Sequence, residues 1–363
     1  MRKSSILAAV VLVAGVVAGG VMAAVSTKTG GGERPAQSSV EIPLGGEGPN
    51  CIGGLCLENL PESIKYAEVG AYLGVLREAL REDPRPETAN MCHTMAHEIG
   101  RRAIKDGSTV QELLNLDDGG CLYGYQHGVL EGWSLRSSLA DLVRGIPEAC
   151  RAYDAGGTLG GLGAGEMGYA KGSCAHGLGH AIALQNIGSV EEAVSYCEGA
   201  GMGQIGGCAG GVFMAYSSEN PSQGGEAAEL RLQKEEVLGL CPRLAGEYQA
   251  ECWSKLWLLG SRVGIGALEV AAICPPSGAE NCGRGVGEGL FYENRLEARE
   301  ALQKCPKSVA DQCAYGVAWA AANVWVGEGN SREEYQSICA EISGIDPVVC
   351  RQNEEAALAG AVR

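Results

Sequence analysis

The stretch EALQKCPKSVADQCAYGVAW, residues 300–319, shows in one place the pattern that decides the fold. An amphipathic segment ends in Cys305, a short polar turn follows, and Cys313 opens a second helical segment. A disulfide between these cysteines would join two antiparallel helices at their shared turn and contribute roughly 2 to 4 kcal/mol of stability. The stretch therefore predicts a disulfide-linked helical hairpin.

The same pattern recurs along a chain of 363 residues with 16 cysteines. Counted back from the C-terminus, the pairs separated by seven or ten residues are Cys339–Cys350, Cys305–Cys313, Cys274–Cys282, Cys241–Cys252 and Cys197–Cys208. The remaining pairs are assigned by elimination as Cys51–Cys56, Cys92–Cys121 and Cys150–Cys174. An even number of regularly spaced cysteines indicates disulfides rather than free thiols.

The N-terminus predicts an exported protein, which explains the disulfides, because the compartment outside the membrane is oxidising. A short basic end precedes residues 6–25, which are 20 uncharged and mostly apolar residues. Such a segment is an export signal, and it is also long enough to span a membrane. The protein is therefore expected to be either secreted or anchored by residues 6–25. Residues 26–50, rich in Gly, Ser and Pro, are expected to be a flexible linker.

We expect residues 51–363 to form an all-α, solenoid-like array of about eight disulfide-linked hairpins, because the helical pairs repeat and strand signals are scarce. The first helices of the pairs are predicted to begin near Pro61, Ser108, Ser137, Ser189, Glu226, Ile265, Arg295 and Ser331. The second helices are predicted to begin near Thr88, Gly119, Lys171, Gly203, Gly246, Ala279, Ser308 and Asp346. Residues 88–187 form a histidine-rich part, and residues 188–363 form a repeat scaffold.

The segments CGRGVGEGLFYENRLEAREALQKC (282–305) and CAYGVAWAAANVWVGEGNSREEYQSIC (313–339) resemble Sel1-like repeats, which are relatives of tetratricopeptide repeats, in their secreted, cysteine-linked form. The resemblance covers roughly residues 190–350. It implies a right-handed superhelix whose concave groove binds a protein or peptide partner. The histidine motifs of this chain do not belong to that pattern.

All five histidines lie in three motifs between Cys92 and His180, namely CHTMAHEIG (92–100), CLYGYQHGVLEG (121–132) and CAHGLGHAIAL (174–184). Two motifs carry histidines four residues apart, a spacing that places both on one face of a helix. Aligning the motifs superposes His93, Tyr123 and His176 and, one turn later, His97, His127 and His180. In a repeat array such positions stack, so we expect a ladder of imidazoles on three neighbouring helices.

This ladder predicts a transition-metal site with one or two ions, because neutral imidazole is a common ligand of copper, iron and zinc. The candidate ligands are His93, His97, His127, His176 and His180, together with Tyr123 and Glu131. Glu98 points away from His97 on its helix and is not a candidate. Non-covalent haem ranks behind a metal ion, and the chain lacks the CxxCH motif of covalent haem. Met214 stands at the position equivalent to His127 in the fourth repeat, and we expect it in the core.

Two functional hypotheses remain at this point. The first is an exported metal-binding protein, for which redox chemistry is favoured over hydrolysis because no general base stands beside the histidines. The alternative is a non-catalytic cell-surface scaffold with structural histidines. The net charge of −16, without a basic run beyond the first residues, excludes nucleic acid as a partner. Contact with a membrane is expected only through the N-terminal segment.

Overall fold

The structure, a computed structural model, describes residues 42, 44–46, 48–83, 86–116, 120–150, 164–185, 189–199, 207–217, 232–294 and 298–327. The chain divides into two units, residues 1–39 and 40–363, and the first lies wholly outside the described residues. The predicted export signal, most of the linker, the eighth hairpin and the Cys339–Cys350 pair also lie outside them. Among the described helices, none combines the length and the apolar character needed to cross a membrane.

The described residues are mostly helical, with very little strand, which is consistent with the all-α class. They form fourteen α-helices and a single two-stranded antiparallel sheet, of β1 (Cys51–Ile52) and β2 (Leu55–Cys56). Gly53 and Gly54 make the turn between the strands with φ values of 56° and 79°, a left-handed conformation that favours glycine. Seven helical pairs are present, while the solenoid of eight hairpins stays a prediction.

Each pair consists of a first and a second helix, as the cysteine pattern predicts. The first helices are α1 (Tyr66–Glu82), α3 (Val110–Leu114), α5 (Leu139–Ala149), α7 (Val190–Gly199), α9 (Lys234–Leu238), α11 (Ala267–Ala271) and α13 (Ala298–Lys304). The second helices are α2 (Pro86–Ala103), α4 (Gly124–Ser134), α6 (Ala164–Ala183), α8 (Cys208–Ser217), α10 (Gly246–Arg262), α12 (Ala279–Glu293) and α14 (Ala310–Gly327).

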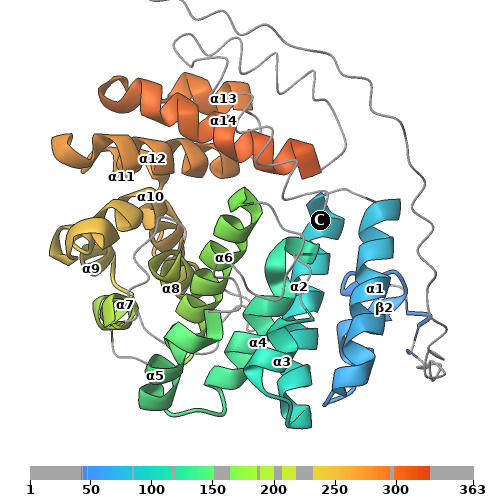
Figure 1. Cartoon of the computed structure of the whole chain (residues 1–363). Coiled ribbons are helices and arrows are strands. Elements are labelled where there is room, and N and C mark those ends of the chain that lie inside the picture. The colour runs from blue at the N-terminus through green and yellow to red at the C-terminus, as the bar shows by residue number, and fades with distance from the viewer. Residues whose placement is uncertain are drawn as a thin grey trace, which may run out of the picture. The chain divides into compact units, whose positions relative to one another are not determined.

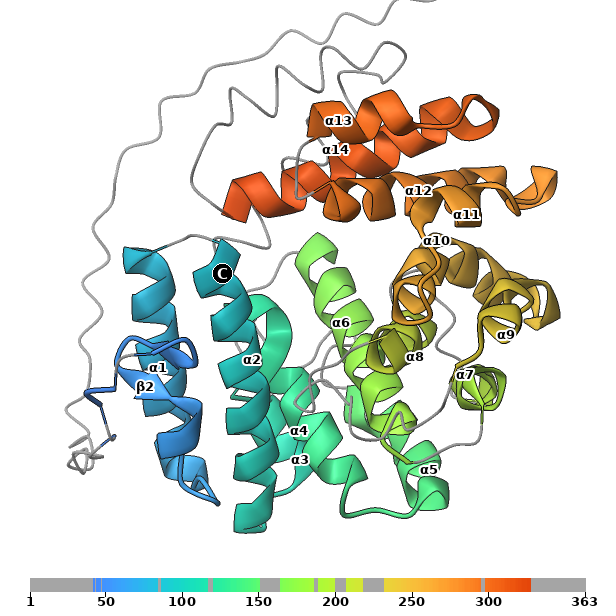
Figure 2. The same cartoon turned by 180° about the vertical axis from the view of Figure 1, so that it is seen from behind.

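The second helices pack against one another in chain order, from α2 on α4 through to α12 on α14 (Figures 1 and 2). We call them the central row. Each first helix packs on the second helix of its own pair, and α14 also contacts α2. Residues at matching positions of α2, α4, α6 and α8 are therefore neighbours in space, although they are far apart in the sequence.

Seven disulfides link the helical pairs and the N-terminal hairpin, and they are the pairs expected from the sequence. They join Cys51–Cys56, Cys92–Cys121, Cys150–Cys174, Cys197–Cys208, Cys241–Cys252, Cys274–Cys282 and Cys305–Cys313. No free cysteine remains among the residues that the structure describes. This density of disulfides indicates an oxidising, extracytoplasmic environment.

Glycines allow the central helices to touch backbone to backbone. A Cβ on Gly128 of α4 would collide with the carbonyl oxygen of His97 on α2. A Cβ on Gly211 of α8 would collide in the same way with the carbonyl oxygen of His176 on α6. Each interior glycine costs a helix about 1 kcal/mol relative to alanine. The close approach of the helices offsets that cost, and it brings the histidines beside these glycines near the next helix.

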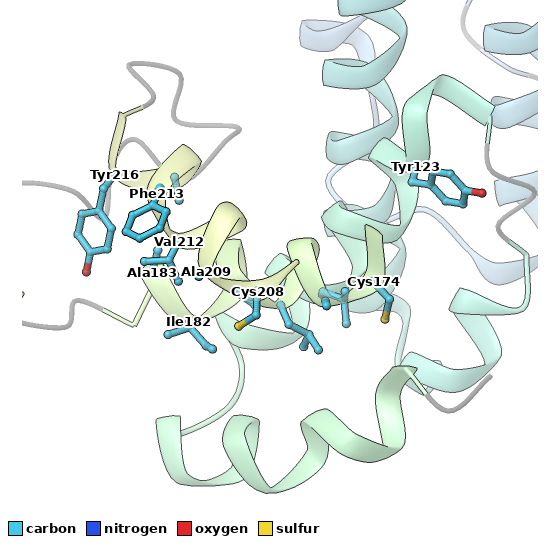
Figure 3. Packing of buried hydrophobic residues seen from close by; sticks show 14 of the residues in the cluster. Tyr123, Cys174, Ile182, Ala183, Cys208, Ala209, Val212, Phe213 and Tyr216 are labelled. Atoms are coloured by element: carbon cyan, nitrogen blue, oxygen red, sulfur yellow. The ribbon is translucent and has the colours of Figure 1, made fainter. Parts of the chain in front are cut away.

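The contact between α6 and α8 shows how the row is packed (Figure 3). Ile182 and Ala183 of α6 lie with Ala209, Val212 and Phe213 of α8 in the buried core, and none of the five is more than 4% exposed. Burying such side chains is the dominant stabilising contribution in a fold of this kind. This apolar contact holds α6 and α8 in a fixed register beside the histidines.

Helix α6 differs from its prediction. It begins at Ala164 rather than near Lys171, so the last part of the glycine-rich segment 154–172 is helical. The segment is rich in glycine but has no proline. Because each glycine weakens a helix by only about 1 kcal/mol, packing against neighbouring helices can extend α6 toward its N-terminus.

Candidate metal centre

Three neighbouring helices of the central row bring all five histidine rings together. His93 and His97 come from α2, His127 from α4, and His176 and His180 from α6. The distances between centroids of neighbouring rings run from 4.6 Å, for His93 and His97, to 5.8 Å, for His97 and His180. The three sequence motifs therefore form one cluster, which we call the histidine cluster.

The histidine cluster is largely shielded from water. His97, His127 and His180 are no more than 5% exposed. Burial disfavours the charged imidazolium, and together with the nearby His97 it lowers the pKa of His93 to about 3. Burial also lowers the pKa of His127 well below its usual range, with His97 and His176 acting in the same direction. His93 and His127 are therefore neutral near pH 7, the form that binds metals.

Hydrogen bonds fix one nitrogen of His93 and one of His127. Nδ1 of His93 lies 2.9 Å from the carbonyl oxygen of Cys121. A carbonyl oxygen only accepts, so this nitrogen donates, and the lone pair of His93 is left on Nε2. Nε2 of His127 lies 3.2 Å from the carbonyl oxygen and 2.9 Å from the hydroxyl of Ser173. Nδ1 of His127 is buried without a hydrogen-bond partner.

Glu131 of α4 contacts two histidines from two other helices. Its Oε2 lies 3.2 Å from Nδ1 of His97, to which it is hydrogen-bonded. Its Oε1 lies 3.2 Å from Nδ1 of His180, but the two atoms do not form a hydrogen bond. Arg101 Nε is a further neighbour, 3.8 Å from Oε2. Burial alone would raise the pKa of this carboxyl, but His97 and His180 outweigh that effect and lower it to about 2.

The carboxylate of Glu131 therefore accepts the Nδ1 proton of His97 and lies beside Nδ1 of His180. Nε2 of His180 is buried without a hydrogen-bond partner. A carboxylate that orients a histidine is the usual outer partner of a metal ligand. The contacts of Glu131 suit this orienting role, and a role as a ligand stays a prediction.

Nε2 of His93 and Nε2 of His97 face each other, 3.1 Å apart. Nδ1 of each ring is already bound, to the carbonyl oxygen of Cys121 and to Glu131, so the gap between the two Nε2 atoms holds either a shared proton or a metal ion. Ligand atoms of His93, His97 and His127 all lie within 4.8 Å of one another. With a metal ion 2.0 to 2.1 Å from two nitrogens at such a separation, the angle at the metal would be roughly 100°, close to tetrahedral. The buried group of three histidines can therefore hold a metal ion.

The packing of the rings favours an ion over haem. Neighbouring rings contact edge to face or tilted, with His127 5.6 Å from His93 and 5.2 Å from His97 between ring centroids. These separations leave no room for a porphyrin between any two rings. The cysteines among the described residues are in disulfides, so thiolate ligands are excluded there as well.

Tyr123 does not stand where the motif alignment predicts. It ends the short 3-10 helix η3 (Gly120–Tyr123) with φ of 61°, and α4 begins only at the next residue. The left-handed turn breaks the four-residue register with His127, so the two side chains do not share one helix face. In Figure 3 its phenol ring stands apart from the packed residues of α6 and α8. A ligand role for Tyr123 stays a prediction without support from the helix geometry.

Met214 and Glu251 lie at the edge of the histidine cluster. Sδ of Met214, on α8, lies 3.4 Å from Nε2 of His176, although we expected this methionine to be a core residue. Glu251 of α10 is 2% exposed. Its Oε1 lies 2.8 Å from the Cβ position of Gly210, and Nδ1 of His176 lies 3.5 Å from the same position. Met214 follows Cys208 by six residues, as His180 follows Cys174. The repeat spacing could therefore have identified Met214 as a neighbour of the histidines. No sequence signal identifies Glu251 in this way.

No protein-family model, no curated protein and no solved structure matches this chain. The resemblance to Sel1-like repeats and the partner groove that it implies therefore stay predictions.

Proposed function

We propose that this protein binds a transition-metal ion through His93, His97 and His127. One observation carries the proposal: Nε2 of His93 and Nε2 of His97 face each other at 3.1 Å, while Nδ1 of each ring is bound elsewhere. A metal ion between these two nitrogens would replace the proton that they otherwise share. The buried, partnerless Nδ1 of His127 supports the same conclusion, because buried polar atoms normally have partners.

The compartment that we propose for this metal centre is outside the cytoplasmic membrane. The seven disulfides support that location. Residues 6–25 would deliver the chain there, either as a cleaved signal or as an anchor. Copper, iron and zinc all suit a set of imidazole ligands.

Redox chemistry is the activity that we propose for this centre, rather than hydrolysis. Hydrolysis at a metal needs a free general base close to the bound water. Glu131 is the carboxylate nearest the rings, and it is held by His97 and His180. A bound copper or iron ion would supply the electron transfer, while the chain would hold the rings neutral, orient them and exclude water.

The metal content of the exported, purified full chain tests the proposal. We expect at least one copper, iron or zinc ion per chain in the wild type, and one ion fewer per chain in a His97→Gln variant. Ser254→Ala is the matched control, because Ser254 stands two residues after Cys252 as His176 does after Cys174, and it should keep its metal. A wild type without stoichiometric metal, after expression with all three metals supplied, would overturn the proposal in favour of a non-catalytic scaffold.

A further inference from the structure

The five histidines and Met214 divide into two groups of three ligands. His93, His97 and His127 form the group described above. His176 and His180 lie on the α8 side, with ring centroids 4.9 Å apart, and Nε2 of His176 faces the thioether sulfur of Met214 at 3.4 Å. We propose that His176, His180 and Met214 form a second metal site, adjacent to the first, that takes Cu(I). This inference rests on the proposed function and extends it.

The backbone holds Met214 at this position. A Cβ on Gly179 of α6 would collide with the carbonyl oxygen of Cys208, and one on Gly211 of α8 would collide with that of His176. The two helices therefore touch within one turn of both histidines. Met214 follows Gly211 by three residues, so it lies on the same side of α8, toward α6. The short distance between Met214 and His176 results from this packing.

Carboxylates lie near both rings of this group. Glu131 lies 3.2 Å from Nδ1 of His180. Oε1 of Glu251, from α10, and Nδ1 of His176 lie 2.8 Å and 3.5 Å from the Cβ position of Gly210. A thioether sulfur only accepts, so without a metal Nε2 of His176 donates to Met214, and Cu(I) would replace that proton. Nε2 of His180 is buried without a hydrogen-bond partner, which marks an incomplete site.

The chemistry of this ligand set selects Cu(I). A thioether is a soft ligand that binds Cu(I) and contributes little to binding of zinc. The separation of 3.4 Å between nitrogen and sulfur suits two ligands of one ion, with metal–nitrogen and metal–sulfur distances of roughly 2.0 and 2.3 Å. The first group, with imidazoles alone, lacks this preference.

The test is a titration of the metal-free, disulfide-intact full chain with Cu(I) under anaerobic conditions, without a thiol reductant and against a competing chelator. Titration with Zn(II) runs in parallel. We expect two Cu(I) and one Zn(II) per wild-type chain. Met214→Leu, a change that conserves volume, should bind one Cu(I) and one Zn(II). Met91→Leu is the matched control, because Met91 is a partly buried methionine that packs against the core, and it should keep two Cu(I).

X-ray absorption of the copper-loaded wild type provides a measurement that does not depend on a variant. Because the described cysteines are oxidised, sulfur next to copper would identify a thioether. One Cu(I) in the wild type, without sulfur and unchanged in Met214→Leu, would overturn the second site and leave the first intact. Two Zn(II) per chain, or copper binding without a sulfur ligand, would also overturn it. A wild type that binds neither metal would instead overturn the proposed function itself.

Discussion

The contact of α2 with α4 and the contact of α12 with α14 use the same backbone packing for different purposes. Gly128 of α4 lies against the carbonyl oxygen of His97, and Gly287 of α12 lies against that of Cys313. In both places glycine lets two central helices touch along their length. The side chains that the packing brings together are different in kind.

Side chains around α12 and α14 complement one another. The guanidinium carbon of Arg284 lies 5.2 Å from the ring centroid of Tyr315 and 4.8 Å from that of Trp319, which is cation–π geometry. Nζ of Lys255 lies 3.3 Å from a carboxylate oxygen of Glu288. Positive charges there meet aromatic faces or a carboxylate.

The histidine cluster, in contrast, brings five imidazole rings from three helices together. The same backbone packing thus supports two outcomes: the side chains of the C-terminal contact complement one another, and the N-terminal contact is the one that we propose a metal ion completes. This contrast makes four predictions that can be measured.

Replacing either contact glycine should destabilise the protein most. In Gly128→Ala and in Gly287→Ala the new Cβ meets a backbone carbonyl that has no room to move, and overpacking of this kind costs about 1 to 3 kcal/mol or more. Both variants should unfold at lower denaturant concentration, but only Gly128→Ala should also lose metal.

Gly70→Ala is the control for these two variants. Gly70 lies within α1, is exposed and has no atom near its Cβ position, so alanine should stabilise the helix by up to about 1 kcal/mol. A Gly128→Ala protein as stable as the wild type would show that the helices do not touch as described.

Acid should destabilise the metal-free protein. His93 has a folded pKa of about 3, below its ordinary value of 6.5, so its contribution to stability is present above pH 6.5 and is lost as pH falls toward 3. Glu131, with a pKa of about 2 against 4.5, adds a loss below pH 4.5. Melting temperatures measured between pH 7.5 and 4 should fall steadily. In His93→Gln the decline between pH 7 and 5 should be shallower, and an identical decline would contradict the assignment.

Exchanging the orienting carboxylate should weaken metal binding without removing a ligand. In Glu131→Gln the amide has one accepting oxygen for two rings, and loss of such an outer partner typically lowers metal affinity 10- to 100-fold. The number of ions bound at saturation should stay the same. Loss of a ligand, in contrast, would lower that number. Glu288→Gln, in the C-terminal contact, should leave the affinity at its wild-type value. Equal losses in the two variants would point to a general effect on folding.

The smallest effect is expected from Arg284→Gln. Removing the cation from the faces of Tyr315 and Trp319 should reduce stability by about 0.5 to 2 kcal/mol. Metal content and affinity should not change, because the C-terminal contact contributes no ligand. Denaturant unfolding and metal analysis of the same preparation check both points. A loss of metal here would show that the two contacts are coupled, and the contrast between them would fail.

Much of the fold could be predicted from local sequence signals. Helix α7 begins at Val190, one residue after the predicted start at Ser189, and α10 and α12 begin at the predicted Gly246 and Ala279. Short, regular cysteine spacing fixes which helices are joined, because a disulfide across a turn needs neighbouring chain segments. The start of α6 was predicted wrongly, because glycine content does not reveal how packing extends a helix.

The sequence predicts which histidines come together in the candidate site, but it does not predict how their rings are oriented. The repeat register places His97, His127 and His180 on adjacent helices. Which ring nitrogen faces the interior depends on backbone carbonyls of Cys121 and Ser173, and these carry no residue-specific signal. Contacts from a distant segment, such as that of Glu251, and a left-handed residue, such as Tyr123, are also invisible to helical periodicity.

The disulfides next to the histidines set an order of events for the life of the protein. Cys92 directly precedes His93, and Cys174 lies two residues before His176. While reduced, these thiols would compete with the imidazoles as softer ligands and would hold copper or zinc in the wrong place. Oxidation to the disulfides removes these competitors. Under the proposed function, oxidation of these cysteines must therefore come before metal loading.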